Sequence, residues 1–251
     1  MNSRTHWRAW LRASLRLTRV VMHFVGGLLT VALRYPFCDD PEKLTLKRRW
    51  SARLLHVLGI SLKVVGELPR NGLVVSNHIS FTDVFAINAC LPCSFVAKDD
   101  VRRWPLIGWL AKNTDTLFLD RGSRRAAQRA QLEMVEHLRA GKHIAVFPEG
   151  TTSNGDCMLP FHSALFQSAI DAAVDVRPIA ICYTDGAGAR SHAAAYIDEM
   201  TLLDCFWSIA CADGIAVTVT LLPSLHAGDG DRRHLSARAH HAISHHLNQL
   251  H

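Results

Sequence analysis

The sequence predicts an α/β fold in which a mostly parallel central sheet is flanked by helices. The first reason is a regular alternation, because short apolar runs rich in β-branched residues take turns with amphipathic stretches from about residue 50 onward. The second reason is composition. A chain of 251 residues with 49% apolar and 20% charged side chains suits one globular domain with a substantial core.

The expected elements follow one another along the chain in this alternating order. Strands are expected at 61–66, 72–76, 94–97, 115–119, 143–147, 176–182 and 215–222, and helices at 81–90, 105–112, 123–140, 162–173 and 232–250. The helix at 123–140 is the clearest, since apolar residues recur there at helical spacing and Gly141 follows as a stop. No repeat or linker interrupts the order, so residues 46–251 are expected to form one domain.

The first 45 residues differ from the rest and are expected to form a helical segment of their own. Arginines recur at nearly every fourth position, which on a helix makes one cationic stripe: Arg4, Arg8, Arg12, Arg16 and Arg19. An apolar run of about 14 residues follows at 20–33, shorter than the about 20 residues that a spanning helix needs. Basic and aromatic residues flank this run, so residues 1–45 are expected to be membrane-associated, as a monotopic or single N-terminal anchor. The alternative is a buried helix packed on the domain.

The charge and the cysteines narrow the class of partner and the compartment. The formal net charge of +6 and the pI near 9.1 favour an anionic partner such as a lipid surface or an acidic carrier protein. No nucleic acid is expected, because no recognition-helix, aromatic-platform or zinc-finger spacing occurs. Seven scattered cysteines do not form a secreted disulfide framework, which favours a reducing cytoplasm. Together these features predict the cytoplasmic face of the inner (plasma) membrane.

A histidine and an aspartate lie five positions apart after an expected strand, in the segment Asn77-His78-Ile79-Ser80-Phe81-Thr82-Asp83. On one continuous helix they would point about 140° apart and could not meet. They can meet if His78 precedes the helix and Ser80 and Asp83 form a capping box at its start. The carboxylate then holds Nδ1–H and leaves Nε2 to accept a proton, which predicts a histidine base. The alternative is a capped helix with a bystander histidine.

A second segment, Phe147-Pro148-Glu149-Gly150-Thr151, directly follows the apolar strand expected at 143–147. The proline ends the strand ladder and the glycine allows a backbone turn. Ligands bind at such turns in open α/β sheets, because the carboxyl ends of parallel strands meet there. Glu149 can accept hydrogen bonds from hydroxyl groups, and Thr151 can donate to an anion. The alternative is an ordinary turn at the exit of a strand.

With these two segments in this order, the chain resembles the glycerolipid acyltransferases, which add a second acyl chain to lysophosphatidic acid and related lysolipids. The resemblance covers roughly residues 60–185. It implies that His78 is the catalytic base and that Asp83 orients it. It also implies that Glu149, Gly150 and Thr151 bind substrate.

Shorter matches extend the resemblance. Phe118 and Arg121 match the Phe-x-x-Arg motif of the family, which implies that Arg121 is the cation for the lipid headgroup. Lys98 lies in the segment between the first two motifs and is implied to bind substrate. Pro178 centres a strand that the family uses to build its acyl pocket.

Three positions depart from the family pattern. Asp115 stands in the segment where the family has a glycine ahead of the Phe-x-x-Arg motif. Thr152 replaces an arginine that often follows the Glu-Gly-Thr turn, and His162 replaces a common lysine. Two cations that help to bind phosphate are thereby absent or weakened, which makes lyso-ornithine lipid a serious alternative acceptor.

The expected function is lysolipid O-acyl transfer, with 1-acyl-sn-glycerol-3-phosphate as acceptor and phosphatidic acid as product. The acyl donor is acyl-CoA or acyl carrier protein, which act as co-substrates, and no cofactor or metal is expected. The alternatives are a lyso-ornithine lipid O-acyltransferase, a thioesterase, and a non-catalytic membrane protein that binds lipid or carrier. The sequence sets no expectation for acyl-chain length or oligomeric state.

Overall fold

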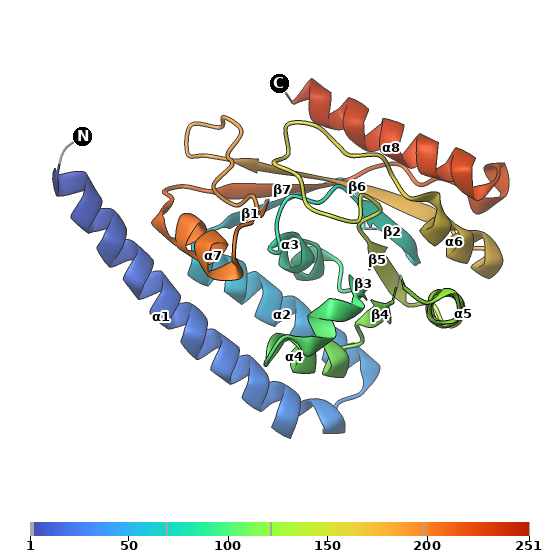
Figure 1. Ribbon diagram of the computed structural model, residues 1–251, viewed down its shortest axis with the longest axis horizontal. Coiled ribbons are helices and arrows are strands. Elements are labelled where there is room, and N and C mark those ends of the chain that lie inside the picture. The colour runs from blue at the N-terminus through green and yellow to red at the C-terminus, as the bar shows by residue number, and fades with distance from the viewer. Residues whose placement is uncertain (1–2, 69, 121, 198, 251) are drawn as a thin grey trace.

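The computed structural model describes residues 3–68, 70–120, 122–197 and 199–250. Its centre is a seven-stranded sheet with the order β1-β7-β6-β2-β5-β3-β4 (Figure 1). The strands are β1 Ser61–Val65, β2 Gly72–Ser76, β3 Ser94–Lys98, β4 Leu117–Leu119, β5 His143–Val146, β6 Val176–Thr184 and β7 Ala216–Leu221. Neighbouring strands are parallel except for the antiparallel pair β6–β7. The expected α/β class with a mostly parallel sheet is therefore confirmed.

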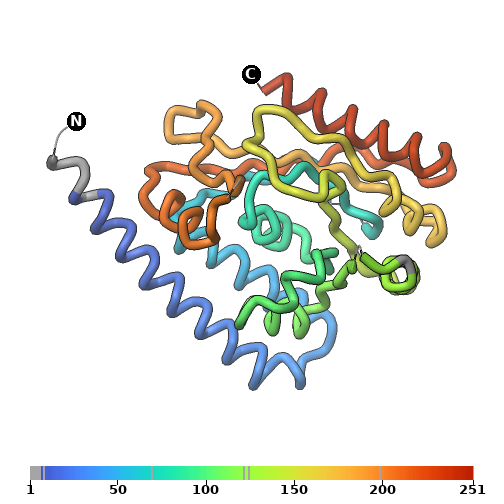
Figure 2. The backbone as a smooth tube through the Cα atoms, in the orientation of Figure 1, coloured from blue at the N-terminus to red at the C-terminus, as the bar shows by residue number. Residues whose placement is uncertain are grey.

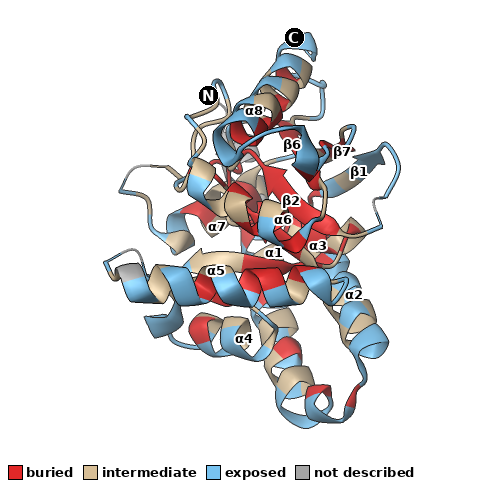
Figure 3. Ribbon diagram, turned by 90° about the vertical axis from the view of Figure 1, so that its right-hand side faces the viewer, coloured by how far each residue is buried: buried red, intermediate tan, exposed pale blue. Residues whose placement is uncertain are grey.

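Helices cover both faces of this sheet. They are α1 Ser3–Leu33, η1 Tyr35–Phe37, α2 Asp40–Leu58, α3 Asp83–Cys90, η2 Asp99–Arg103, α4 Ile107–Asn113, α5 Arg124–Arg139, η3 Ser163–Phe166, α6 Gln167–Ala172, α7 Leu202–Cys211, η4 Ala227–Asp229 and α8 Arg232–Gln249. One core cluster joins α1, α2, α3 and α7 to one sheet face, and a second joins α5, α6 and α8 to the other. The buried strands lie between these two helical layers (Figure 3).

Two helices, α2 and α7, were not expected from apolar spacing, although α2 has clear end signals. Asp39 caps its start by accepting a hydrogen bond from the Glu42 N–H at 2.8 Å, and Gly59 ends it at a φ of 79°. The division expected between residues 45 and 46 falls inside α2. The helix expected at 162–173 is instead a 3₁₀ turn, η3, followed by the short helix α6.

The turn before β4 shows how the chain replaces the glycine of the family pattern. Asp115 has a φ of 63°, in the left-handed region, so the strand expected from 115 begins only at Leu117. Aspartate tolerates this conformation better than most residues with a Cβ. Its carboxylate lies 3.8 Å from the Lys47 ammonium, whose side chain is only 10% exposed. This contact ties α2 to the turn that leads into β4.

The long helix α1 lies along one side of the domain (Figure 2). Arginine side chains attach it to the domain. Arg12 donates to the carbonyl of Cys211 at 2.7 Å, and Arg16 donates to the carbonyl of Ala212 at 2.7 Å. These carbonyls at the end of α7 have no partners within that helix, and the cations also suit its dipole. The segment Ala9–Leu33 is a helix of 25 residues, long and apolar enough to cross a membrane. The apolar run expected at 20–33 is therefore part of a longer helix, in which apolar residues before position 20 alternate with arginines.

Candidate active site

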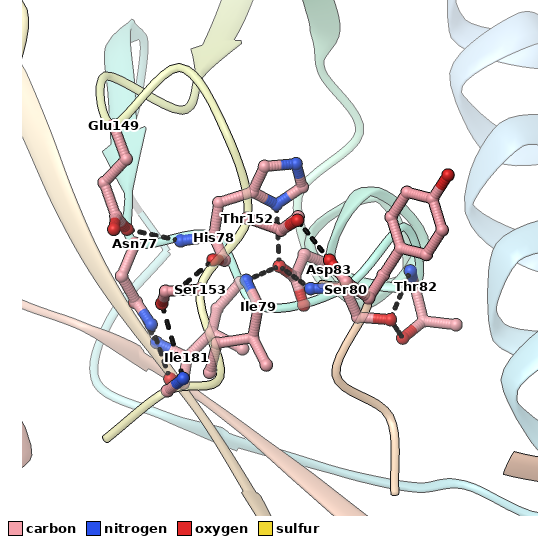
Figure 4. A network of polar contacts seen from close by, with 12 residues as sticks. Asn77, His78, Ile79, Ser80, Thr82, Asp83, Glu149, Thr152, Ser153 and Ile181 are labelled. Atoms are coloured by element: carbon pink, nitrogen blue, oxygen red, sulfur yellow. Dashed lines mark hydrogen bonds and ion pairs between the residues drawn. The ribbon is translucent and has the colours of Figure 1, made fainter. Parts of the chain in front are cut away.

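His78 lies just beyond the carboxyl end of β2, where a network of polar contacts holds it (Figure 4). Its Nδ1 lies 2.9 Å from Oδ2 of Asp83, and its ring stacks on Phe147 with the centroids 3.8 Å apart. The backbone before it is fixed by Asn77, whose side chain exchanges hydrogen bonds of 2.9 and 2.8 Å with the backbone of Ile181. Because Nδ1 is held by a carboxylate, Nε2 is the ring nitrogen left to accept a proton.

Asp83 is fully buried and is the first residue of α3. Its Oδ2 also accepts hydrogen bonds from the backbone N–H groups of Ile79 at 2.7 Å and Ser80 at 2.9 Å. The expected capping box is only half formed, because the Ser80 hydroxyl accepts from the Thr82 N–H at 3.2 Å and not from Asp83. The helix thus starts two residues later than expected, and the carboxylate serves the turn and the imidazole together.

Glu149 connects the two motifs. It is 4% exposed, and its two oxygens accept hydrogen bonds of 2.8 Å from the backbone N–H groups of His78 and Leu159. Burial raises the pKa of Glu149, and the two backbone donors offset part of that shift. The carboxylate therefore holds the His78 segment against the loop after β5. A direct contact of Glu149 with substrate stays a prediction.

The histidine lies in the wall of a cavity of about 580 Å³ that is lined mainly by apolar side chains. Helices α1, α2, α3 and α4, the carboxyl ends of β3 and β5, and the loop before α7 all contribute to it. Cavities of this size accommodate elongated organic ligands. Within the described ranges, the cavity wall includes few ionisable side chains besides His78: Lys47, Lys98, Asp100, Tyr35, Cys93 and Tyr196.

The structure brings some of the expected substrate-binding residues to this cavity and leaves others away from it. Lys98, Gly150 and Thr151 line it, and Gly150 adopts a φ of 74° that a glycine permits. Phe118 does not line it, because its ring packs under the Arg102 guanidinium at 4.6 Å. Pro178 is buried in β6 opposite Val75 and does not line it either. Arg121 lies outside the described residues.

Two contacts at the site could not be predicted from sequence motifs. Tyr183 donates from its hydroxyl to Oδ1 of Asp83 at 2.7 Å across 100 positions of sequence. Thr152 donates from its hydroxyl to the carbonyl of Tyr196 and so joins the turn to the loop before α7. Neither residue belongs to a spaced pattern, and the only signal in the sequence was that Thr152 departs from an arginine. Among the described residues, no three His, Cys, Asp or Glu side chains are placed to hold a metal ion.

The fold and this polar cluster define a class, that of α/β enzymes whose site lies at the carboxyl ends of parallel strands beside an apolar cavity. The chain belongs to the acyltransferase family. The family model described as Acyltransferase matches residues 61–182. The family expected from the two motifs is confirmed, and with it the expectation of an acyltransferase enzyme.

Individual relatives carry two kinds of name. The chain is 36% identical over 237 residues to the lyso-ornithine lipid O-acyltransferase of Pseudomonas aeruginosa, covering 93% of this chain and 91% of that protein. It is also 36% identical over 184 residues to the 1-acyl-sn-glycerol-3-phosphate acyltransferase of Neisseria meningitidis, covering 72% of each. The crystal structure of the 1-acyl-sn-glycerophosphate acyltransferase PlsC from Thermotoga maritima matches with a TM-score of 0.74 at 23% identity, covering 98% of this chain and 97% of that one. This last match establishes the shared fold.

Proposed function

We propose that this protein transfers an acyl group from a thioester to the free hydroxyl of a lysolipid at a membrane surface. The observation that carries the proposal is the position of His78. Its Nδ1 is held 2.9 Å from a fully buried carboxylate, and its ring lies in the wall of an apolar cavity of about 580 Å³. A base beside a cavity of this kind suits a substrate with a reactive oxygen and a long hydrocarbon chain.

In the proposed reaction, Nε2 of His78 takes the proton of the lysolipid hydroxyl while the hydroxyl oxygen attacks the carbonyl carbon of the thioester. Asp83 keeps the imidazole in the right tautomer and stabilises the imidazolium. The tetrahedral intermediate collapses with loss of the thiolate, which recovers the proton from His78, so that a diacyl lipid and a free thiol result. The donor is acyl-CoA or acyl carrier protein, and neither a metal nor a cofactor takes part.

Charge on the intermediate must be offset by donors in the cavity wall, each worth about 3 kcal/mol in comparable sites. Two backbone N–H groups of the turn are already engaged, since Gly150 donates to Phe147 and Ser153 donates to His78. The Thr151 hydroxyl and the Lys98 ammonium, which both line the cavity, are the proposed donors. Arg121 stays a prediction as the headgroup cation.

For the acceptor we favour lyso-ornithine lipid, with lysophosphatidic acid as the second candidate. The Thr152 hydroxyl is engaged by Tyr196, so the position that carries an arginine in the family pattern supplies a structural contact and no cation. A phosphomonoester is bound best by several cations, and Lys98 and Lys47 are the lysines in the described part of the cavity wall. The relative from Pseudomonas aeruginosa, which aligns over 93% of the chain, has the matching name. Lysophosphatidic acid is supported by the name of the Neisseria relative.

The test is acyl transfer by purified protein in detergent, with acyl-CoA and acyl carrier protein as donors and both lysolipids offered in parallel. His78→Ala is expected to lower kcat at least about 100-fold, the usual scale for a general base. An active His78→Ala variant contradicts the mechanism. Release of free fatty acid without a lysolipid indicates a thioesterase, and lipid binding without turnover indicates a binding protein.

We further propose that α1 lies on the membrane and does not cross it. A crossing helix would have to give up the contacts of Arg12 and Arg16 with the end of α7. The outer face of α1 exposes several large apolar side chains, among them Leu29 at 55% and Leu33 at 69%. Such a face suits burial at the boundary between headgroups and acyl chains of the cytoplasmic leaflet.

Flotation with phosphatidylglycerol vesicles tests this proposal on the full chain. The double variant Leu29→Ser and Leu33→Ser is expected to bind vesicles more weakly than wild type, because it removes apolar area from the buried face. Leu132→Ser is the matched control, since Leu132 is 60% exposed but lies on α5, on the other side of the sheet. Equal loss of binding in both variants contradicts the role of α1.

A further inference from the structure

Tyr183 lies behind the His78–Asp83 pair and belongs to none of the motifs discussed above. It comes from β6, is 1% exposed, and its hydroxyl donates to Oδ1 of Asp83 at 2.7 Å. The same hydroxyl lies 2.8 Å from Oγ1 of Thr82, which in turn lies 2.9 Å from Oγ of Ser80. Thr82 and Ser80 are fully buried, so a chain of hydroxyl groups shielded from solvent ends at the Asp83 carboxylate.

The direction of the Tyr183 hydrogen bond follows from chemistry. An ionised carboxylate can only accept, so the tyrosine hydroxyl must donate. Burial, followed by the nearby Asp83 charge, raises the pKa of Tyr183 well above its ordinary value. The phenol therefore keeps its proton over the whole pH range in which an enzyme is assayed.

The two oxygens of Asp83 are held very differently. Oδ2 accepts from His78 and from the backbone of Ile79 and Ser80, whereas Oδ1 accepts from Tyr183. The three donors at Oδ2 hold one oxygen of the carboxylate in place. The donor at Oδ1 holds the other oxygen, so the carboxylate is anchored at both ends, and it also draws negative charge away from the oxygen that faces the imidazole.

We propose that Tyr183 is a positioning residue for acyl transfer, which through Oδ1 of Asp83 sets both the orientation and the proton affinity of His78. This inference rests on the proposed role of His78 as the base. It assigns a function in the reaction to a side chain 100 positions away from its partner in sequence.

Other ionisable groups surround the pair and must be considered in any pH measurement. Glu149 contacts the backbone of His78 from the turn after β5. Cys205 of α7 lies behind Ser80, and burial raises its pKa to about 11, so the thiol stays neutral in the assay range. Lys98 and Asp100 line the cavity that His78 faces. A change confined to the Tyr183 hydroxyl leaves all four of these groups in place.

The experiment is Tyr183→Phe, with kcat and kcat/KM measured against pH on the full chain. Without the donor, the negative charge of Asp83 acts more fully on the imidazole, so the imidazolium is favoured and the base needs a higher pH to become neutral. The acid limb of the profile is therefore expected to move to higher pH by about half a unit. The plateau kcat is expected to fall about 10-fold, the scale of one hydrogen bond to a charged group.

Two control variants separate positioning from simple stability. Ser168→Ala removes another buried hydroxyl, that of Ser168 on α6, which donates to the carbonyl of Leu165 at 2.7 Å. This variant is expected to lower stability without moving the acid limb. In the Asp83→Asn background, Tyr183→Phe is expected to shift the acid limb no further, because an amide carries no charge to redistribute. An equal shift in that background overturns the proposal.

The remaining outcomes are also decisive. If Tyr183→Phe leaves both the profile and kcat within twofold of wild type while His78→Ala is inactive, the inference on Tyr183 fails and the proposed function stands. If His78→Ala is active, the proposed function itself fails. Should Tyr183→Phe not fold, Thr82→Val removes the contact at 2.8 Å from the same hydroxyl and is expected to move the acid limb in the same direction. No movement in that variant then overturns the proposal.

Discussion

The replacement Asp83→Asn offers a sharp test of the site because the structure dictates how the new amide must sit. Two backbone N–H groups, those of Ile79 at 2.7 Å and Ser80 at 2.9 Å, point at Oδ2. An amide NH₂ in the Oδ2 position would place its own N–H donors against the N–H donors of Ile79 and Ser80. The carbonyl oxygen of the amide must therefore take the Oδ2 position and the NH₂ must face the Tyr183 hydroxyl, which can accept. In this orientation His78 keeps its Nδ1–H tautomer.

The magnitude follows from this orientation. The imidazolium loses a charged acceptor 2.9 Å away but keeps a neutral one, which amounts to about 2–3 kcal/mol of transition-state stabilisation. That energy corresponds to a loss in kcat of about 30- to 150-fold. If the amide instead turned its NH₂ toward Nδ1, the histidine would hold the wrong tautomer, and losses near 10⁴-fold are known for that situation.

The assay is single-turnover acyl transfer at the plateau of the pH profile, with Asp229→Asn as the control. Asp229 forms an exposed ion pair with Arg238 at 2.9 Å, so removing its charge is expected to leave the rate unchanged. A loss near 10⁴-fold in Asp83→Asn would refute the reasoning, because it would mean that Ile79 and Ser80 do not orient the amide. A loss below about threefold would refute the catalytic role of the charge.

Three further predictions concern stability. In Glu149→Gln, only one of the two backbone donors now at 2.8 Å keeps an acceptor. The free energy of unfolding, measured by urea titration, should therefore fall by about 2 kcal/mol. Wild-type stability of this variant would contradict the paired role of the two carboxylate oxygens. Burial, followed by the charge of Arg177, lowers the pKa of His143 in the folded protein. The imidazole therefore binds a proton more tightly in the unfolded chain than in the folded one. The contribution of neutral His143 to stability is complete above about pH 6.5 and is lost as the pH falls below that value. His143→Gln should accordingly make urea stability less dependent on pH between about 6.5 and 5.5, and an unchanged slope excludes this group. Asp115→Ala should lose about 1–2 kcal/mol more than Asp115→Asn, because alanine is strained at a φ of 63° and asparagine tolerates it; equal thermal unfolding of the two variants argues against that strain.

Local patterns in the sequence predicted the strands and the contact between His78 and Asp83 well. All seven expected strands occur within two residues of their expected ends, because each is a short apolar run that can be recognised from the local sequence alone. The pair His78 and Asp83 was also predictable, since five positions around a turn bring them together without help from the rest of the chain. The detail of the capping box failed because Ser80 prefers the nearer N–H of Thr82, a choice that spacing does not resolve.

The order of the strands, the contact between His78 and Asp83, and the family can all be predicted from the sequence, because these features depend on residues close together in the chain. Which distant residues reach His78 and Asp83 depends on the packing of the folded chain. Only the place of β6 beside β2 brings Tyr183 to Asp83, and only the turn after β5 brings Glu149 to the backbone of His78. The same packing keeps Phe118 and Pro178 out of the cavity wall although both match family motifs. Contacts across 70 to 100 positions depend on strand order and helix packing, and neither can be predicted from the periodicity of apolar residues along the chain.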